Sequence, residues 1–442
     1  MIQQDLRGSR LSGANHKSLT TYETGLRQFS IYTGDPLASA DAALAESPEF
    51  VMAHVLRAYL HLMGTEPAGL PIAEASLNAA DHLPASRQEK GHLTAIRHLT
   101  HGRWQAASQV LEDVAIENPN DLLALQAGHL VDFFRGDARM LRDRIARVLP
   151  QWLPATPGYH AMLGMHAFGL EEMGQYSEAE ASGRRAVECE PCDIWAQHAV
   201  AHVCDMQGRH RDGIAWMEDN AARWPDDCFF AIHNWWHLAL YYLDLGIIDK
   251  VLALYDGPIY GTRSRIVLDM VDATAMLWRL HLRGIDVGNR WTAIADAWEP
   301  LADAGNYAFN DMHATMAFVG AGRPQAIIRV LETQKLAMTE AGDNAMFTRD
   351  VGDPATRAIQ AFGEGHYAET VSLLRGVRNI ASRFGGSHAQ RDVLDLTLIE
   401  AALRSGQQAL ARALAAERAA VKPASPLARL FLTRAATLSL AA

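Results

Sequence analysis

The sequence predicts an all-α fold in which helix pairs stack into a solenoid, and three observations support this prediction. Glycines that follow apolar, helix-like segments recur at intervals of 34 to 43 residues. A second amphipathic segment follows most of these glycines. Signals for β-strands are nearly absent, because the sequence has no Asn-Gly hairpin turn and no sustained period-two alternation.

The predicted repeat is a first helix, a glycine turn, a second helix and a loop. The turn glycines are Gly64, Gly102, Gly136, Gly174, Gly208, Gly246, Gly284, Gly322, Gly365 and Gly406. Their spacing is that of a tetratricopeptide repeat or a slightly longer version of it. We therefore expect a tetratricopeptide-like right-handed superhelix of about ten helix pairs, each burying one face against its neighbours.

Residues 1–442 are expected to form one helical-repeat domain with three successive parts. Residues 18–190 form the N-terminal repeats, where RWQAASQVLEDVAIENPND (103–121) has the pattern of a second helix and its closing loop. Residues 191–325 carry most of the polar first-helix side chains, and residues 326–442 form the C-terminal repeats. KPASP (422–426) is the one short stretch with the composition of a linker.

The amino-acid composition and the net charge disfavour several classes of function. With 49% hydrophobic and 21% charged residues the chain can bury a large core, and its net charge of −11 disfavours binding to nucleic acid or to anionic lipid. Neither an apolar signal-peptide core nor an 18-residue apolar run occurs. Four cysteines are too few for a disulfide framework in a chain of this length. We expect a cytoplasmic protein, and self-association into a homo-oligomer is left open.

Two His-x-x-x-His pairs, HAVAH (198–202) and HNWWH (233–237), lie on predicted first helices, which line the concave side of such a solenoid. Counted back from the turn glycines, Asn234, Asp272 and Asn310 share one position on three consecutive helices. Histidines follow two of them by three residues, at 237 and 313. Residues three or four apart share a helix face, so these groups are expected to lie close together.

Most single histidines on helices are packing or surface residues, but this concentration of polar groups favours a functional cavity. The candidate catalytic residues are His237, His313 and Asp272. The candidate substrate-binding residues are His198, His233, Asn234, Trp236, Asp269, Asn310, Asp311, Arg349 and Arg391. The candidate metal ligands are His198, His202, His233 and His237, for zinc or another divalent transition metal.

Other motifs give little support to alternative chemistry. Cys189 and Cys192 have CxxC spacing, but no second CxxC pair follows and the βαβ setting of a redox motif is missing. The sequence has no GxGxxG after a strand, no GxxxxGK[ST], no GxSxG and no HExxH. No sequence motif therefore supports a nucleotide-binding, serine-hydrolase or zincin function.

Several longer strings resemble the tetratricopeptide repeat protein 38-like family. They are AHVCDMQGR (201–209), HNWWHLALYYLDLG (233–246), LDMVDATAMLWRL (268–280), NDMHATMAFVGAG (310–322), RDVG (349–352), GGSHAQRDVL (385–394) and KPASPLARL (422–430). The resemblance implies a helical-repeat protein and assigns no reaction. Most of the candidate residues above lie inside these strings, as do Asp350 and Asp392.

Three functions remain open. The first is binding of a small molecule, with or without its hydrolysis by water that a histidine or a metal activates. The second is a scaffold that holds a peptide in its concave groove without catalysis. The third is a metal-binding protein in which the two histidine pairs supply the ligands.

Overall fold

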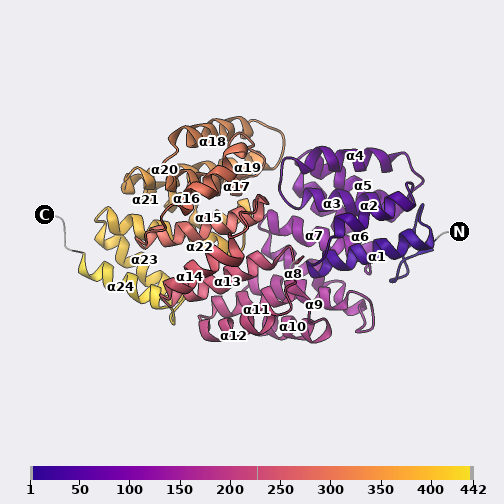
Figure 1. Ribbon diagram of the computed structural model, residues 1–442, viewed down its shortest axis with the longest axis horizontal. Coiled ribbons are helices and arrows are strands. Elements are labelled where there is room, and N and C mark those ends of the chain that lie inside the picture. Colours follow the sequence, from indigo (N-terminus) through magenta and orange to yellow (C-terminus); the bar gives the residue numbers. More distant parts are fainter. Residues whose placement is uncertain (1–2, 226, 439–442) are drawn as a thin grey trace. The chain divides into compact units, whose positions relative to one another are not determined.

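The computed structural model describes residues 3–225 and 227–438, and almost all of its regular structure is helical (Figure 1). The described strands, β1 (Gln3–Gln4) and β2 (Arg10–Leu11), form one short antiparallel pair. The chain divides into two compact units. The first comprises residues 1–200 and 220–231, and the second comprises residues 201–219 and 232–442. The all-α fold class predicted from the sequence is confirmed.

The first unit consists of consecutive helices that pack as pairs. Its helices are α1 (His16–Ile31), α2 (Pro36–Glu46), α3 (Val51–Leu62), α4 (Gly69–Asp81), α5 (Arg87–Thr100), α6 (Trp104–Glu117), α7 (Leu122–Phe134), α8 (Ala138–Ala146), the 3-10 helix η1 (Leu149–Gln151), α9 (Tyr159–Glu172), α10 (Tyr176–Cys189) and the start of α11 (Ile194–Met206). From α1 to α10, each α-helix contacts the next α-helix in sequence, as expected of stacked helix hairpins.

The second unit continues with the rest of α11 and the following helices. These are α12 (His210–Ala221), α13 (Ala231–Asp244), α14 (Ile248–Leu254), η2 (Tyr255–Ile259), α15 (Val267–Leu282), α16 (Arg290–Trp298), η3 (Glu299–Leu301), α17 (Ala308–Gly320), α18 (Pro324–Ala337), α19 (Asn344–Phe347), η4 (Thr348–Gly352), α20 (Asp353–Gly363), α21 (Tyr367–Val377), η5 (Arg378–Phe384), α22 (His388–Arg404), α23 (Gln408–Val421) and α24 (Pro426–Thr437). Helices α15 and α22 are distant in sequence but pack side by side (Figure 1).

The predicted glycine turns end the first helices. Nine of the ten glycines have a positive φ, between 65 and 79°. After α9, the Gln175 N–H donates to the Leu170 carbonyl at 2.8 Å, the bond that closes a left-handed helix terminus. The exception is Gly64, where Thr65 adopts the positive φ instead, at 54°.

Three fully buried tryptophans anchor the core of the second unit. The indole N–H of Trp278 donates to Thr397 Oγ1 at 3.0 Å, and that of Trp298 donates to Thr274 Oγ1 at 2.9 Å. The third, Trp236, has no hydrogen-bond partner for Nε1 within the described part of the chain. A buried indole N–H normally finds a partner, so Trp236 marks an unusual place in this core.

KPASP is a packed connection and not a linker, which corrects the expectation from composition. Lys422 is buried and forms an ion pair with Asp205 at 2.9 Å. Ser425 caps α24 and donates from Oγ to Asp244 at 2.7 Å. The segment therefore ties the last helices to α11 and α13.

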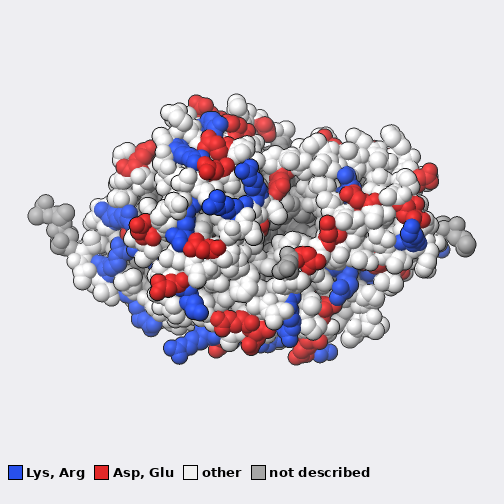
Figure 2. Space-filling model, in the orientation of Figure 1, with Lys and Arg blue, Asp and Glu red and all other residues white. Residues whose placement is uncertain are grey.

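The described residues also bear on membrane crossing, whereas they do not test the predicted domain boundaries. None of their helices combines the length and the apolar character that a membrane crossing requires. The single domain over residues 1–442, with internal boundaries at 190 and 325, stays a prediction. On the face in Figure 2, acidic and basic side chains are interspersed.

Candidate functional site

Helices α13, α15 and α17 bury the polar side chains that the sequence singled out. Each is a first helix whose apolar residues pack on several sides, so even its polar positions lie inside the unit. Seven of these side chains are at most 8% exposed: Asn234, His237, Asp269, Asp272, Asn310, Asp311 and His313. His233 retains 13% side-chain exposure. These eight side chains therefore lie largely buried within the second unit, and their catalytic and binding roles stay predictions.

A hydrogen-bonded chain of one carboxylate and two imidazoles forms the centre of the cluster. His233 Nδ1 lies 2.7 Å from Asp272 Oδ2, and His233 Nε2 lies 3.2 Å from His237 Nε2. The carboxylate accepts the Nδ1 proton of His233, which leaves Nε2 of that ring as a hydrogen-bond acceptor. His237 then donates from Nε2, and its Nδ1 is the basic nitrogen. This arrangement fixes one tautomer for each ring.

His202 on α11 joins these two histidines. Its ring centroid lies 4.4 Å from that of His237, and each of the three rings offers a nitrogen within 4.8 Å of the others. Burial lowers the pKa of His202 well below the ordinary value, and the neighbouring His233 adds to the effect. Burial likewise lowers the pKa of His237, with His202 and His233 contributing. Both rings are therefore neutral bases at neutral pH.

Several buried polar atoms on α13, α15 and α17 have no hydrogen-bond partner among the described residues. Neither the amide oxygen nor the amide nitrogen of Asn234 has a hydrogen-bond partner among the described residues, and the same holds for Trp236 Nε1, Asp272 Oδ1 and His313 Nε2. An unsatisfied buried polar group costs about 1–3 kcal/mol. The Trp236 indole is parallel to the ring of His233, with centroids 5.3 Å apart. Such a concentration of unsatisfied donors and acceptors is characteristic of a binding site.

Arg279 on α15 connects these groups, although the sequence analysis did not select it. Its guanidinium carbon lies 5.2 Å from the centre of the Trp236 ring, and its Nη2 donates to the Ala389 carbonyl at 2.7 Å. Burial lowers the pKa of Arg279 to about 10, so the group remains charged at neutral pH. Its charge contributes to lowering the pKa values of His237 and His313. The signal was an arginine within the otherwise apolar string AMLWRL, since arginine is almost never fully buried unless it is paired.

On α17 two titratable groups have unusual pKa values. Burial raises the pKa of Asp311 to about 7, against a weak hydrogen bond from Gln334 Nε2 at 3.3 Å. Burial lowers the pKa of His313 to about 4, and its Nδ1 donates to the Phe309 carbonyl at 2.8 Å. His313 Nε2 is consequently an acceptor, while Asp311 changes its charge near neutral pH.

The remaining candidates occupy separate surroundings. Asp269 accepts from Ser264 Oγ at 2.6 Å. Arg391 donates to the Gly386 carbonyl, and its charge contributes to lowering the pKa of His202. Arg349 is exposed on η4 and donates to the Met338 carbonyl at 3.3 Å. The binding roles of these residues stay predictions.

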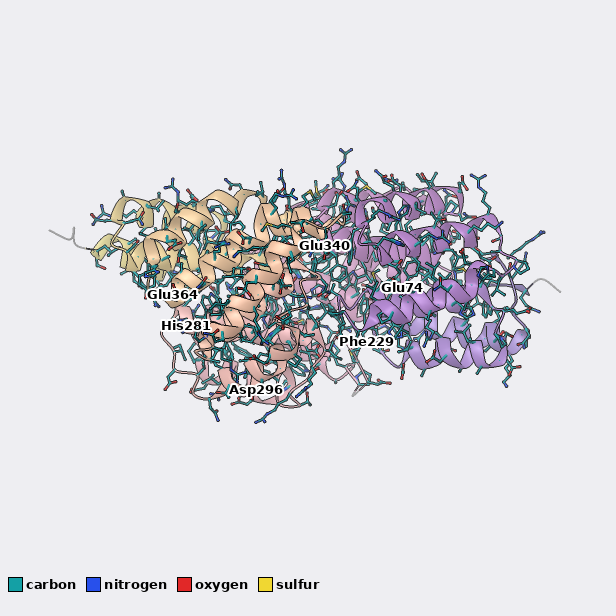
Figure 3. The ribbon with its side chains drawn as sticks, turned by 90° about the horizontal axis from the view of Figure 1, so that it is seen from above. Glu74, Phe229, His281, Asp296, Glu340 and Glu364 are labelled. Atoms are coloured by element: carbon teal, nitrogen blue, oxygen red, sulfur yellow. The ribbon has the colours of Figure 1, made fainter. Side chains whose placement is uncertain are left out.

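His198 belongs to the first unit. There its imidazole packs among aromatic rings, with centroids 4.9 Å from Trp195, 5.1 Å from Phe230 and 5.4 Å from Phe168. Its place among the metal ligands and substrate contacts therefore stays a prediction, while His202, His233 and His237 are brought together within the second unit. His281, labelled in Figure 3, packs on Trp278 with ring centroids 5.3 Å apart.

The cysteines offer no alternative centre. Cys189 is exposed, Cys192 is half-buried, and Cys204 and Cys228 are buried, all as free thiols. Burial raises the pKa of the Cys228 thiol to about 11, which disfavours the reactive thiolate. Among the described residues, no cysteine belongs to a group of side chains with metal-ligand geometry.

No known family model matches the chain. Among solved structures, it is similar to the human IFIT1 dimer with m7Gppp-AAAA, at 14% identity and a TM-score of 0.44, over 97% of this chain and 96% of that one. The human IFIT1 dimer with PPP-AAAA gives 14% identity and 0.42, over 97% and 96%. Yeast Tom70 gives 11% identity and 0.33, over 91% and 85%.

The fold is a tetratricopeptide-type α-solenoid. Its helix pairs, its left-handed glycine turns and the near absence of strands in the described chain establish this class. The nucleotides in the IFIT1 structures belong to that protein. The expectation that this chain binds no nucleic acid stays a prediction from its charge.

Proposed function

We propose that this chain is a helical-repeat protein that binds a small polar molecule at the cluster formed by α13, α15 and α17, and hydrolyses it. The observation that carries the proposal is the chain Asp272–His233–His237 beside the unsatisfied side chain of Asn234. A scaffold that only packs helices would gain stability from apolar residues at these positions. Membership of the tetratricopeptide repeat protein 38-like family is part of this proposal and rests on the strings quoted above.

The residues divide the proposed chemistry among them. His237 accepts a proton from water at Nδ1 and passes its Nε2 proton to His233, whose positive charge Asp272 stabilises. The amide N–H groups of Asn234 and Asn310 donate to the oxygen of the substrate carbonyl, on which negative charge develops. The charge of Arg279 favours the neutral form of the His237 imidazole at rest. Water is the attacking group, because the chain has no activated serine or cysteine motif. When the bond between the carbonyl carbon and the leaving group breaks, His233 and His237 return the proton taken from water to the leaving group.

The proposal is tested by mass spectrometry of metabolites retained by the purified protein from a cell extract. We expect wild type to retain, or to convert, a compound that His237→Gln neither binds nor converts. His281→Gln is the matched control, since His281 is a half-buried histidine that packs on Trp278 outside the cluster. Identical sets of retained and converted compounds for all three proteins would contradict the proposal.

A second candidate function is metal binding by His202, His233 and His237. Two imidazole nitrogens that share a tetrahedral zinc at about 2.0–2.1 Å lie about 3.3 Å apart, and the Nε2 atoms of His233 and His237 are 3.2 Å apart. Asp272 accepts from the opposite nitrogen of His233, as carboxylates do behind zinc-bound histidines. The depressed pKa values of His202 and His237 keep both rings in the neutral form that binds metal.

Elemental analysis separates the two candidates. Protein purified without a metal-affinity column should carry about one zinc or similar ion per chain, with His202→Gln lowering the content and His281→Gln leaving it unchanged. A folded wild-type protein without metal, which also gains none on dialysis against zinc, would exclude this candidate and leave the histidine–aspartate mechanism.

A further inference from the structure

A second site lies at the opposite end of α13 and α15 from the histidine cluster. A cavity of about 530 Å³ is bounded by the last turns of these helices, by α22 and by α24. This volume lies in the range of small-molecule pockets. Its apolar wall includes Leu243, Leu282, Leu396, Leu430 and Phe431. Leu430 is 49% exposed, so part of the apolar wall is open to solvent.

The side chains that line this cavity carry more positive than negative charge. Four arginines and a single glutamate line it, an excess of three positive charges in a chain whose net charge is −11. Two of the arginines share the glutamate: Arg404 Nε lies 2.7 Å from Glu400 Oε1, and Arg434 Nη1 lies 2.7 Å from Glu400 Oε2. The other two arginines, Arg279 and Arg283, form no ion pair with Glu400.

Arg279 and Arg283 donate to backbone carbonyls, and neither forms an ion pair within the described part of the chain. Arg283 Nη1 donates to the Leu243 carbonyl at 2.5 Å, while its Nη2 is buried without a described hydrogen-bond partner. Burial lowers the pKa values of both arginines to about 10, so both are cations at neutral pH. Isolated buried cations are costly unless an anion compensates them.

Three acidic side chains that attract these two arginines are also engaged with other groups. Asp392 pairs with Arg418 at 2.7 Å, and Asp205 pairs with Lys422 at 2.9 Å. Asp244 Oδ2 lies 2.9 Å from His210 Nε2. The protein therefore does not supply a dedicated counter-ion for the two arginines at the cavity wall.

We propose that this cavity binds an organic carboxylate with an apolar tail, of the medium-chain fatty acid class. The carboxylate accepts hydrogen bonds from Arg283 Nη2 and is attracted by the charge of Arg279, while the tail packs on the leucines and on Phe431. The site differs from the proposed hydrolytic centre, because it is built from other residues apart from Arg279.

Titration calorimetry of the full-length protein tests the proposal with decanoate as the probe and decanol as the neutral counterpart. We expect saturable binding of one decanoate per chain, with decanol weaker by about tenfold or more, because it lacks the charge-assisted hydrogen bond. Arg283→Met should weaken decanoate about tenfold and leave decanol unchanged. Arg290→Met is the control, since Arg290 pairs with Asp256 outside this cavity.

Leu430→Glu provides a second test that does not touch a buried charge. Because Leu430 is half exposed, the fold should tolerate the change, and a carboxylate at the cavity wall should repel decanoate. Absence of decanoate binding to wild type would overturn the proposal. So would equal affinities for decanoate in wild type, Arg283→Met and Leu430→Glu, or equal affinities of the wild type for decanoate and decanol.

Discussion

Asp311 shows how burial alone creates a titratable group near neutral pH. Because its pKa in the folded protein is raised to about 7, the protonated carboxyl is the form that the folded state favours. The free energy of unfolding that this group contributes is present below the ordinary carboxyl pKa and is lost as the pH rises through 7.

The isosteric amide mimics the protonated carboxyl of Asp311. We therefore expect Asp311→Asn to raise the free energy of unfolding by about 1–4 kcal/mol at pH 8 and to change it much less at pH 5. Urea unfolding at both pH values measures this difference. Asp303→Asn is the control at an exposed ion pair with Arg329 and should show no such pH dependence. A destabilised Asp311→Asn at pH 8 would contradict the raised pKa.

At the scale of the element, two glycines show the effect of backbone conformation apart from that of side-chain packing. Gly365, between α20 and α21, has a φ of +79°, and an added Cβ would meet no atom within 4 Å. Gly376, within α21, is equally open but has no positive φ. The two positions differ in backbone conformation and not in space.

The same substitution at these two glycines should therefore have opposite effects. Gly365→Ala should lower the free energy of unfolding by about 1 kcal/mol, because a side chain disfavours the left-handed conformation. Gly376→Ala should raise it by about 0.5 kcal/mol, because alanine favours the helix. Denaturant unfolding monitored by circular dichroism measures both, and a loss of stability in both variants would contradict this separation.

At the scale of the molecule, buried and half-buried charges join the last helices of the second unit to its earlier ones. Asp392 on α22 binds Arg418 on α23 at 2.7 Å, and Lys422 binds Asp205 on α11 at 2.9 Å. Burial alone would raise the pKa of Asp392, but Arg418 and Lys422 outweigh it and hold the pKa well below the ordinary range. Its ionised form therefore stabilises the folded unit above about pH 4, and this stabilisation is lost as the pH falls further.

Removing this charge should destabilise the second unit. We expect Asp392→Asn to lower the free energy of unfolding by about 3 kcal/mol at pH 7, because it leaves Arg418 without its counter-ion, and to have less effect in acid. Asp353→Asn removes a partly exposed pair with Arg357 and should cost less than about 1 kcal/mol. Equal costs for the two variants in denaturant unfolding would show that the buried network does not hold this unit together.

The helix order, the glycine turns and the shared polar positions on α13, α15 and α17 were predictable from the sequence, because each follows from local periodicity. The spacing of the turn glycines fixes where first helices end, and residues at equal offsets from them fall on equivalent faces. Asn234, Asp272 and Asn310 were found in this way. Gly64 shows the limit, since the neighbouring Thr65 takes the left-handed conformation there.

Only the tertiary structure decided which partners these residues meet. It paired His233 with Asp272, brought His202 to His237, and placed Arg279 over Trp236. It also showed that KPASP is held by Lys422. Such pairings join residues far apart in the chain, and they depend on how side chains pack between helices, which no local pattern contains. The sequence determined the scaffold and its polar face, whereas long-range packing determined the chemistry that this face can carry.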